Sequence, residues 1–206
     1  MGVAVNGVKR QFKLWAELVA QAMAGTGVTP TGLTLIGFGL NLVVAVVLAM
    51  GALTVGGILV LVAGLFDTLD GAMARVTKRS TAFGAFLDST LDRYSEAALL
   101  LGLAYDAARR ANLPIVVLAF VVLAGSLMVS YCRARAEGLG LNCEVGIVPR
   151  PERVVILGGG LILGLELPAL ALLAILTNVT AIQRILHVYS LTKETTTSGQ
   201  PGRPGP

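Results

Sequence analysis

The sequence predicts an all-α integral membrane protein in which six transmembrane helices follow an N-terminal amphipathic interfacial helix. Hydrophobic residues make up 55% of the 206 positions and charged residues only 14%, whereas about 25% of the residues in a typical soluble domain are charged. The mean hydropathy is +0.79. The chain also contains six apolar segments, and a helix needs about 20 mostly apolar residues to cross a bilayer. These observations exclude an ordinary soluble domain.

Residues that start or stop helices separate the apolar segments. Pro30 opens the first segment, Gly51 ends it, and Pro114 opens the fourth. The second segment is short for a crossing, so we expect either one helix that continues through the polar residues as far as Arg75 or a helical break before them. The six segments are residues 33–50, 53–66, 83–105, 115–131, 154–165 and 167–182.

The two ends of the chain are predicted to lie outside the helical bundle. Residues 1–27 contain a stretch in which basic residues are mixed with Trp15 and Leu18, which suits a helix lying in the membrane interface; the alternative is a frayed terminus. Residues 195–206 are rich in Ser, Thr, Gly and Pro, and we expect a disordered tail over residues 193–206. The transmembrane domain is then predicted to cover residues 28–192.

The distribution of basic residues predicts the orientation of the chain. Lys and Arg gather at one set of helix ends and connections, whereas the opposite set keeps only Arg109 and Arg110. The positive-inside rule then places the segments 67–92 and 133–153 together on the cytoplasmic side. The net charge of +4 therefore reflects the orientation of the chain in the membrane. It makes membrane lipids the expected partners and does not indicate a nucleic-acid partner.

Four aspartates stand within predicted helical segments, where a charged side chain costs roughly 3 kcal/mol on insertion scales. Asp67 and Asp70 are three positions apart and Asp88 and Asp92 are four apart, so each pair projects from one face of its helix. Four carboxylates that face one another repel unless a cation lies between them, and all-oxygen ligands select a hard ion. The sequence therefore predicts a site for one or two Mg²⁺ or Mn²⁺ ions.

The residues around the aspartates indicate what such ions would hold. Gly71, Ala74 and Gly84 are small, so a bulky ligand could approach the backbone there. Arg75 adds a cation beside the acids, and magnesium bound by a few carboxylates usually completes its shell with substrate phosphate. We therefore expect a pyrophosphate ligand.

These residues carry a family resemblance. The run Asp67-Thr-Leu-Asp-Gly-Ala-Met-Ala-Arg75 is followed, eight residues later, by Gly84-Ala-Phe-Leu-Asp-Ser-Thr-Leu-Asp92. Together they resemble the complete signature of the CDP-alcohol phosphotransferases, with all eight fixed identities present. The resemblance covers roughly residues 8–192 and implies the interfacial helix, six transmembrane helices and a homodimer. Two other interpretations of the aspartates, a structural ion-pair network and a cation-coupled transporter, leave the small residues unexplained.

The resemblance implies that an alcohol attacks the β-phosphorus of a CDP-linked lipid and that CMP leaves. It implies that the four aspartates bind two Mg²⁺ or Mn²⁺ ions, with Asp92 as the general base, and paired metals do stabilise the attacking and leaving oxygens of such a displacement. Thr31 departs from the family pattern, which often has Asn there. The implied donor-binding residues are Pro30, Thr31, Gly32, Leu33, Gly71, Ala74, Arg75, Thr81 and Gly84.

The identity of the acceptor has to be inferred from residues outside the aspartate signature. The runs Tyr131-Cys-Arg-Ala-Arg-Ala-Glu137, Arg150-Pro-Glu-Arg153 and Thr180-Ala-Ile-Gln-Arg184 resemble the phosphatidylinositol phosphate synthases of actinobacteria and their archaeal counterparts. That branch implies inositol phosphate as the acceptor, CDP-diacylglycerol or an ether-lipid equivalent as the donor, and a prokaryotic cell membrane as the location. The alternatives are glycerol 3-phosphate as the acceptor and arginines that only face lipid headgroups. The implied acceptor-phosphate residues are Arg133, Arg135, Arg150, Arg153 and Arg184.

A few other residues have structural interpretations. Cys132 and Cys143 show neither a metal-ligand spacing nor a disulfide framework, so we interpret them as inert thiols. Asn41 lies at membrane depth and is expected to bond a neighbouring helix or line the cleft. Gly160 and Gly164 could bring two helices close together, within one subunit or across a dimer.

Overall fold

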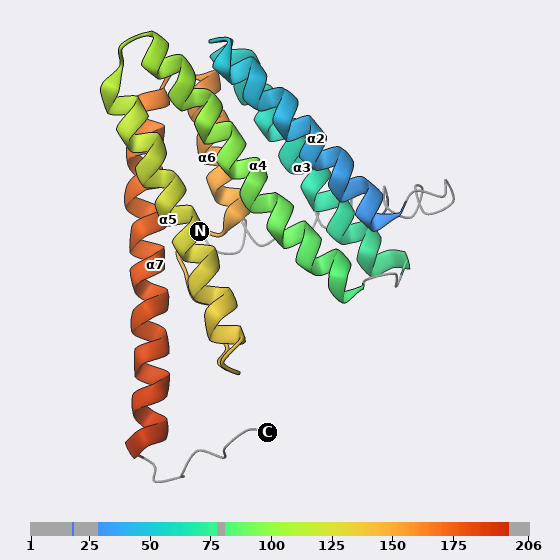
Figure 1. The fold of residues 1–206 in the computed structure, drawn as a ribbon, viewed down its shortest axis with the longest axis vertical. Coiled ribbons are helices and arrows are strands. Elements are labelled where there is room, and N and C mark those ends of the chain that lie inside the picture. The colour runs from blue at the N-terminus through green and yellow to red at the C-terminus, as the bar shows by residue number, and fades with distance from the viewer. Residues whose placement is uncertain (1–17, 19–28, 78–80, 198–206) are drawn as a thin grey trace.

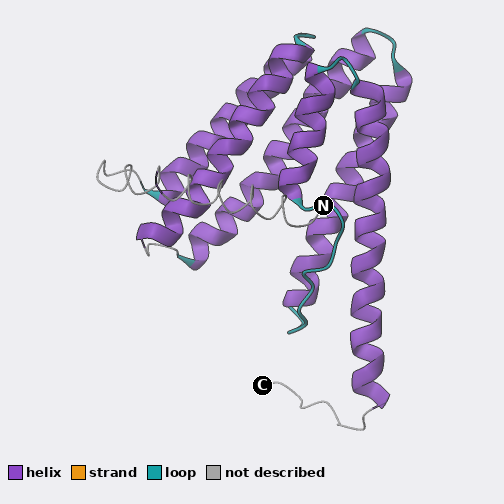
Figure 2. Cartoon of the chain, turned by 180° about the vertical axis from the view of Figure 1, so that it is seen from behind, coloured by secondary structure: helices purple, strands orange, loops and turns teal. Residues whose placement is uncertain are grey.

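The computed structural model describes residues 18, 29–77 and 81–197, and all regular secondary structure in these residues is helical (Figure 2). The all-α class is thus confirmed, and the described residues form six main helices, of which three are long and apolar enough to cross a membrane. The predicted interfacial helix, apart from Leu18, and residues 198–206 lie outside the described residues. The helices are α2 (Pro30–Ala49), α3 (Leu53–Thr77), α4 (Ala82–Arg109), α5 (Leu113–Glu137), α6 (Arg150–Ile162) and α7 (Glu166–Thr197).

Threonine caps fix the starts of the two helices that lead into the site. The Thr29 side chain accepts a hydrogen bond from the Gly32 backbone N–H at 3.1 Å, one residue before Pro30 begins α2. The Thr81 side chain accepts from the Gly84 N–H at 2.9 Å and caps α4 in the same way. Each cap satisfies one of the backbone donors that have no partner inside the helix.

Helix α3 is continuous from Leu53 to Thr77, so the alternative of a helical break is wrong. At 1.5 Å per residue its 25 residues span about 37 Å, which joins an apolar half and a polar half in one rod. Its apolar part, Leu53–Leu69, is shorter than a full span, whereas α2, α5 and the part of α7 from Glu166 to Lys193 are long and apolar enough to cross a membrane. The aspartates of α3 therefore stand where its apolar part ends.

The six helices pack in a closed ring (Figure 1): α2 on α4, α4 on α5, α5 on α7, α7 on α6, α6 on α3, and α3 on α2. Helices α4 and α6 lie on opposite sides of this ring, and their backbones do not pack directly against each other. Each helix contributes to one apolar core, which stabilises the ring through the hydrophobic effect. The core includes Val44, Val60, Leu103, Val122, Leu161 and Leu173.

Close helix approaches in the ring depend on residues without a side chain. A Cβ at Gly102 of α4 would clash with the backbone carbonyl of Ala45 on α2. A Cβ at Gly160 of α6 would clash with Ala169 of α7, so the close approach expected at this glycine occurs within one chain. Gly164 instead lies in the turn after α6, with a φ of 68° that favours glycine.

A polar cluster ties α4 to α7 at the end of the molecule that is uppermost in Figure 1. Arg110 donates to both carboxylate oxygens of Glu166, at 3.0 and 3.2 Å, and lies 2.8 Å from a carboxylate oxygen of Asp106. These hydrogen bonds, above all the one to Glu166, raise the pKa of Arg110 above its ordinary value. The two hydrogen bonds between Arg110 and Glu166 join the end of α4 to the start of α7, far from the aspartates of α3.

Helix α7 is longer than predicted. It continues to Thr197, so residues 193–197 of the predicted disordered tail are helical, and the predicted start of the tail is corrected. The physical reason is that the first Gly or Pro after Leu191 is Gly199, and Thr and Lys at the intervening positions are tolerated in a helix.

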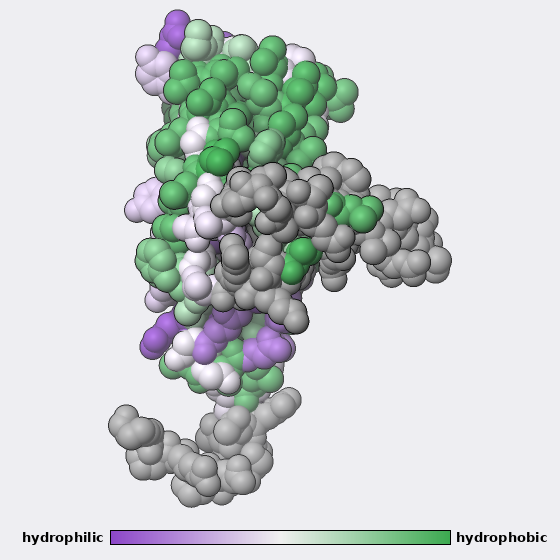
Figure 3. All heavy atoms as spheres, turned by 90° about the vertical axis from the view of Figure 1, so that its right-hand side faces the viewer, coloured by the Kyte–Doolittle hydropathy of each residue, from purple (hydrophilic) through white to green (hydrophobic). Residues whose placement is uncertain are grey.

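The surface is broadly apolar over the upper part of the molecule, while hydrophilic residues gather lower down (Figure 3). Large side chains such as Ile36, Val46, Phe120 and Ile175 are more than half exposed. An apolar surface of this extent would be unfavourable in water but matches a lipid environment. The exposed apolar helices therefore indicate association with a membrane.

Candidate active site

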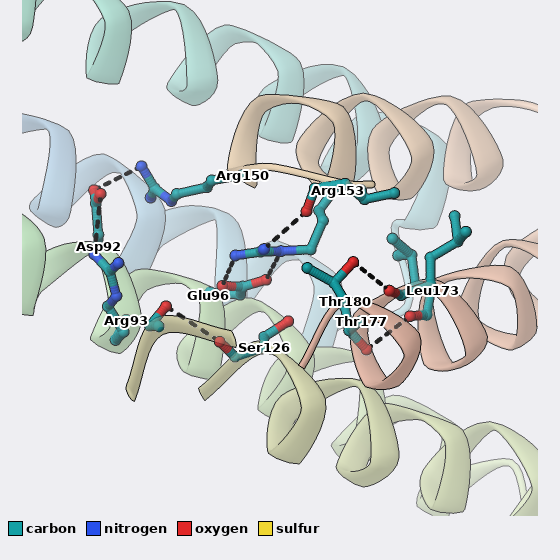
Figure 4. A network of polar contacts seen from close by, with 12 residues as sticks. Asp92, Arg93, Glu96, Ser126, Arg150, Arg153, Leu173, Thr177 and Thr180 are labelled. Atoms are coloured by element: carbon teal, nitrogen blue, oxygen red, sulfur yellow. Dashed lines mark hydrogen bonds and ion pairs between the residues drawn. The ribbon is translucent and has the colours of Figure 1, made fainter. Parts of the chain in front are cut away.

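Arg150 joins two of the predicted metal ligands. As the first residue of α6 it reaches across the ring, with Nη2 2.9 Å from Oδ2 of Asp67 on α3 and Nη1 2.6 Å from Oδ1 of Asp92 on α4 (Figure 4 shows the contact with Asp92). All three side chains are about one fifth exposed. One guanidinium thus bridges carboxylates from two helices, as the predicted site requires, and its single positive charge offsets only one of their two negative charges.

Asp88 lies one turn before Asp92 on α4, and its charge repels those of both Asp67 and Asp92. This brings together three of the four predicted carboxylates. The side chain of Asp70 lies outside the described part of the structure. Among the side chains that the structure does describe, no three acidic, histidine or cysteine groups converge on one point to form a ready metal site.

The residues nevertheless fit a divalent cation. The donors are all carboxylate oxygens, the ligands that Mg²⁺ and Mn²⁺ prefer. Gly37 of α2 faces them, and a Cβ at this position would lie 3.2 Å from Oδ1 of Asp67. Glycine therefore leaves space beside this oxygen. Gly37 was not predicted from the sequence. A glycine in a helix interior lowers helix stability by about 1 kcal/mol relative to alanine, so its presence there could have indicated a functional position.

A second ion pair crosses the ring one turn further along both helices. Arg153 of α6 donates from Nε and Nη2 to the two carboxylate oxygens of Glu96 on α4, at 2.9 and 3.1 Å (Figure 4). Its Nη1 lies 3.5 Å from the Val148 carbonyl, and the residue is only 5% exposed. Sequence reasoning missed Glu96, although it follows Asp92 by four positions and so shares its helix face.

The two ion pairs border a small, partly open cavity of about 30 Å³. Its polar lining consists of Asn41, Asp67, Glu96, Arg150 and Arg153, and its remaining walls are apolar. Asn41 donates a hydrogen bond to the Gly37 carbonyl of its own helix at 2.9 Å. It was expected either to bond a neighbouring helix or to line the cleft, and the structure shows the second of these roles. The polar groups of the site therefore converge inside the ring.

The other predicted acceptor arginines lie apart from this cavity. Arg184 of α7 is 8% exposed and donates to the carbonyls of Val145 and Val129, at 2.9 and 2.5 Å. Arg133 pairs with Glu137 at 2.7 Å and lines an open groove of about 1160 Å³ between α4 and α5. Arg135 is exposed near the end of α5. The charges of Arg133 and Arg153 still act on Arg184.

The predicted donor-binding residues come from three segments, and the structure shows that the starts of α2 and α4 meet. A Cβ at Gly84 of α4 would lie 3.6 Å from the Thr31 hydroxyl of α2. The Leu33 side chain is buried against Leu69 and Met73, which leaves only its backbone for a ligand. Pro30 and Gly32 form the first turn of α2, and Thr81 caps α4. Gly71, Ala74 and Arg75 lie on α3, but the structure describes only their backbone.

This arrangement belongs to a known class of enzyme. A model of the CDP-alcohol phosphatidyltransferase family matches residues 27–192, and the chain belongs to that family. Archaetidylinositol phosphate synthase from Pyrococcus horikoshii is 36% identical over 182 residues, which are 88% of this chain and 94% of the relative.

Solved structures agree with this assignment. Phosphatidylinositol phosphate synthase of Mycobacterium tuberculosis with CDP-DAG bound has a TM-score of 0.77 and 34% identity, over 84% of this chain and 93% of that one. The same enzyme in complex with manganese and citrate has a TM-score of 0.75 and 33% identity, over 84% and 88%. The resemblance read from the aspartate signature is therefore confirmed at the level of the family.

Proposed function

We propose that the chain transfers a phosphatidyl group, or its ether-lipid equivalent, from a CDP-diacylglycerol-type donor to inositol phosphate and releases CMP. The observation that carries this proposal is the contact of Arg150 with Asp67 and Asp92, because it sets a phosphate-binding cation beside the carboxylates of the donor site. Relatives named for inositol phosphate lipid synthesis support the choice of acceptor.

The metal ligands in this proposal are the four aspartates, which would hold two Mg²⁺ or Mn²⁺ ions. The manganese complex of the mycobacterial enzyme supports a divalent ion. When bound, the ions neutralise the pyrophosphate and stabilise the attacking and leaving oxygens. Gly37 keeps space beside Asp67 for this purpose. The start of α2, the polar half of α3 and the start of α4 would hold the CDP group through the donor-binding residues named above.

The proposed reaction assigns one proton transfer to the chain itself. The acceptor hydroxyl oxygen attacks the β-phosphorus of the donor, the bond from that phosphorus to the oxygen of CMP breaks, and Asp92 takes the hydroxyl proton. Asp92 suits this role because its carboxylate faces Arg150 and so lies next to the phosphate of a bound acceptor.

The acceptor phosphate would bind first to the arginines of α6. Arg150 is long, partly exposed and located at the helix start, so it can exchange a carboxylate for a phosphate without unfolding α6. Arg153 lies one turn deeper, and Arg184 is its electrostatic neighbour. Arg133 and Arg135, at the end of α5, complete the proposed set.

We further propose that all six helices cross a prokaryotic cell membrane, with the aspartates near its cytoplasmic side, that the interfacial helix precedes them and that the chain forms a homodimer. The concentration of Lys and Arg around the site supports this orientation. The exposed apolar side chains of α2, α5 and α7 support contact with lipid or with a second copy.

The test is CMP release by the purified protein from CDP-diacylglycerol and Mg²⁺, with inositol 1-phosphate, glycerol 3-phosphate, serine or free inositol as the acceptor. We expect release only with inositol 1-phosphate, and none after EDTA is added. Release with glycerol 3-phosphate alone would overturn the acceptor but keep the metal site. Absence of release with every acceptor would contradict transfer, and release in EDTA would contradict the metal.

A further inference from the structure

Helix α4 bears one more acidic residue that faces the site and has no part in the proposed chemistry. Glu96 follows Asp92 by four residues, and its side chain is only 17% exposed. It binds Arg153 of α6 across the ring, where the backbones of α4 and α6 do not pack against each other. Glu96 is therefore the residue of α4 that holds the guanidinium of Arg153.

The contact uses a defined part of the guanidinium. The Nε–H and one Nη2 N–H point to the two oxygens of Glu96. A bidentate contact of this kind fixes the plane of the group as well as its distance. Nη1 has only the 3.5 Å approach to the Val148 carbonyl, so it is the least engaged donor of Arg153. The pair therefore fixes a buried cation in the lining of the polar cavity and leaves Nη1 as the donor that can best take a further partner.

We infer that Glu96 is a positioning residue that sets acceptor affinity by holding Arg153 with its Nη1 edge directed at the acceptor phosphate. Glu96 itself touches no reacting atom. This inference rests on the proposed function, because it takes Arg153 as a phosphate ligand. It explains why an acid lies one turn beyond the aspartates on the same face of α4.

Glu96→Gln provides the test. The amide of glutamine has the shape of the carboxylate but no charge, and its nitrogen cannot accept a hydrogen bond. Arg153 therefore loses one of its two hydrogen bonds to this side chain. We expect the KM for inositol 1-phosphate to rise at least about tenfold, the effect of losing one hydrogen bond to a charged group. The KM for CDP-diacylglycerol, and kcat at saturating acceptor, should stay within about twofold of wild type, because the aspartates are untouched.

The matched control is Glu166→Gln. Glu166 also binds an arginine through both oxygens and also joins two helices, here α4 and α7, but at the opposite end of the ring. Loss of an interhelical ion pair by itself would affect both variants alike. We therefore expect Glu166→Gln to lower thermal stability without changing the KM for inositol 1-phosphate.

A second variant covers the case in which Glu96→Gln does not fold. Glu96→Asp keeps the charge but withdraws the carboxylate by about 1.5 Å, one carbon–carbon bond, and should raise the acceptor KM severalfold. A wild-type acceptor KM in either folded variant would overturn the inference, and so would an equal rise in the donor KM. Failure of the proposed function would instead appear in the wild-type protein, as no CMP release with inositol 1-phosphate.

Discussion

Asp92→Asn is expected to lower kcat for CMP release by about 10²–10⁴-fold, the usual contribution of a general base. The amide keeps the size of the side chain and can still accept a hydrogen bond from Arg150, which lies 2.6 Å from the carboxylate. It cannot take the proton of the acceptor hydroxyl. The loss should therefore appear in the chemical step when both substrates are saturating.

The comparison variant is Asp67→Asn. Asp67 contacts the same arginine but is proposed only as a metal ligand. We expect isothermal titration with Mn²⁺ to show weaker binding for Asp67→Asn than for Asp92→Asn, and CDP-diacylglycerol binding to follow the same order. If Asp92→Asn turns over at the wild-type rate, the assignment of the base is wrong.

Gly37→Leu is expected to abolish both Mn²⁺ binding and turnover, with losses of at least about 100-fold, as for other displacements of reacting groups by about 1 Å. Its Cβ would already lie 3.2 Å from Oδ1 of Asp67, and the rest of the side chain would fill the space proposed for the ion. Helix α2 itself should gain stability, because leucine favours a helix interior by nearly 1 kcal/mol over glycine.

The control is Gly39→Leu, two residues further along α2, where a Cβ would meet nothing within 4 Å. This variant should bind Mn²⁺ and release CMP as the wild type does. Thermal unfolding of both variants checks that each one folds. Wild-type Mn²⁺ affinity in a folded Gly37→Leu protein would show that the ion does not lie beside Asp67.

Local features of the sequence predicted the helices well, because caps and breakers act over a few residues. Pro30 starts α2 as expected, and Pro114 lies in the first turn of α5. The exception is the end of α7, where a compositional prediction of disorder overlooked that the chain contains no Gly or Pro between Leu191 and Gly199 to end the helix. The ring order could not be read in the same way, since it depends on contacts such as Gly102 with Ala45 that join distant segments.

In the candidate site, too, features local to one helix could be predicted, whereas contacts between distant segments could not. The spacing of the aspartates placed Asp67, Asp88 and Asp92 together, because each pair is local to one helix and the helices are neighbours in the chain. The partner of Arg153 is 57 residues away, so neither Glu96 nor the burial of the guanidinium could be predicted from α6 alone. The five arginines were grouped by motif, whereas the structure shows Arg150 at the aspartates and Arg184 bound to backbone carbonyls.

The most direct test of the metal site is anomalous diffraction from crystals grown with Mn²⁺. We expect two manganese peaks between the aspartates of α3 and those of α4, within coordination distance of Asp67 and Asp92, with Arg150 withdrawn from at least one of these two aspartates. Crystals with manganese bound elsewhere, or with no peak between these helices at saturating Mn²⁺, would contradict the proposal that the aspartates hold the catalytic ions.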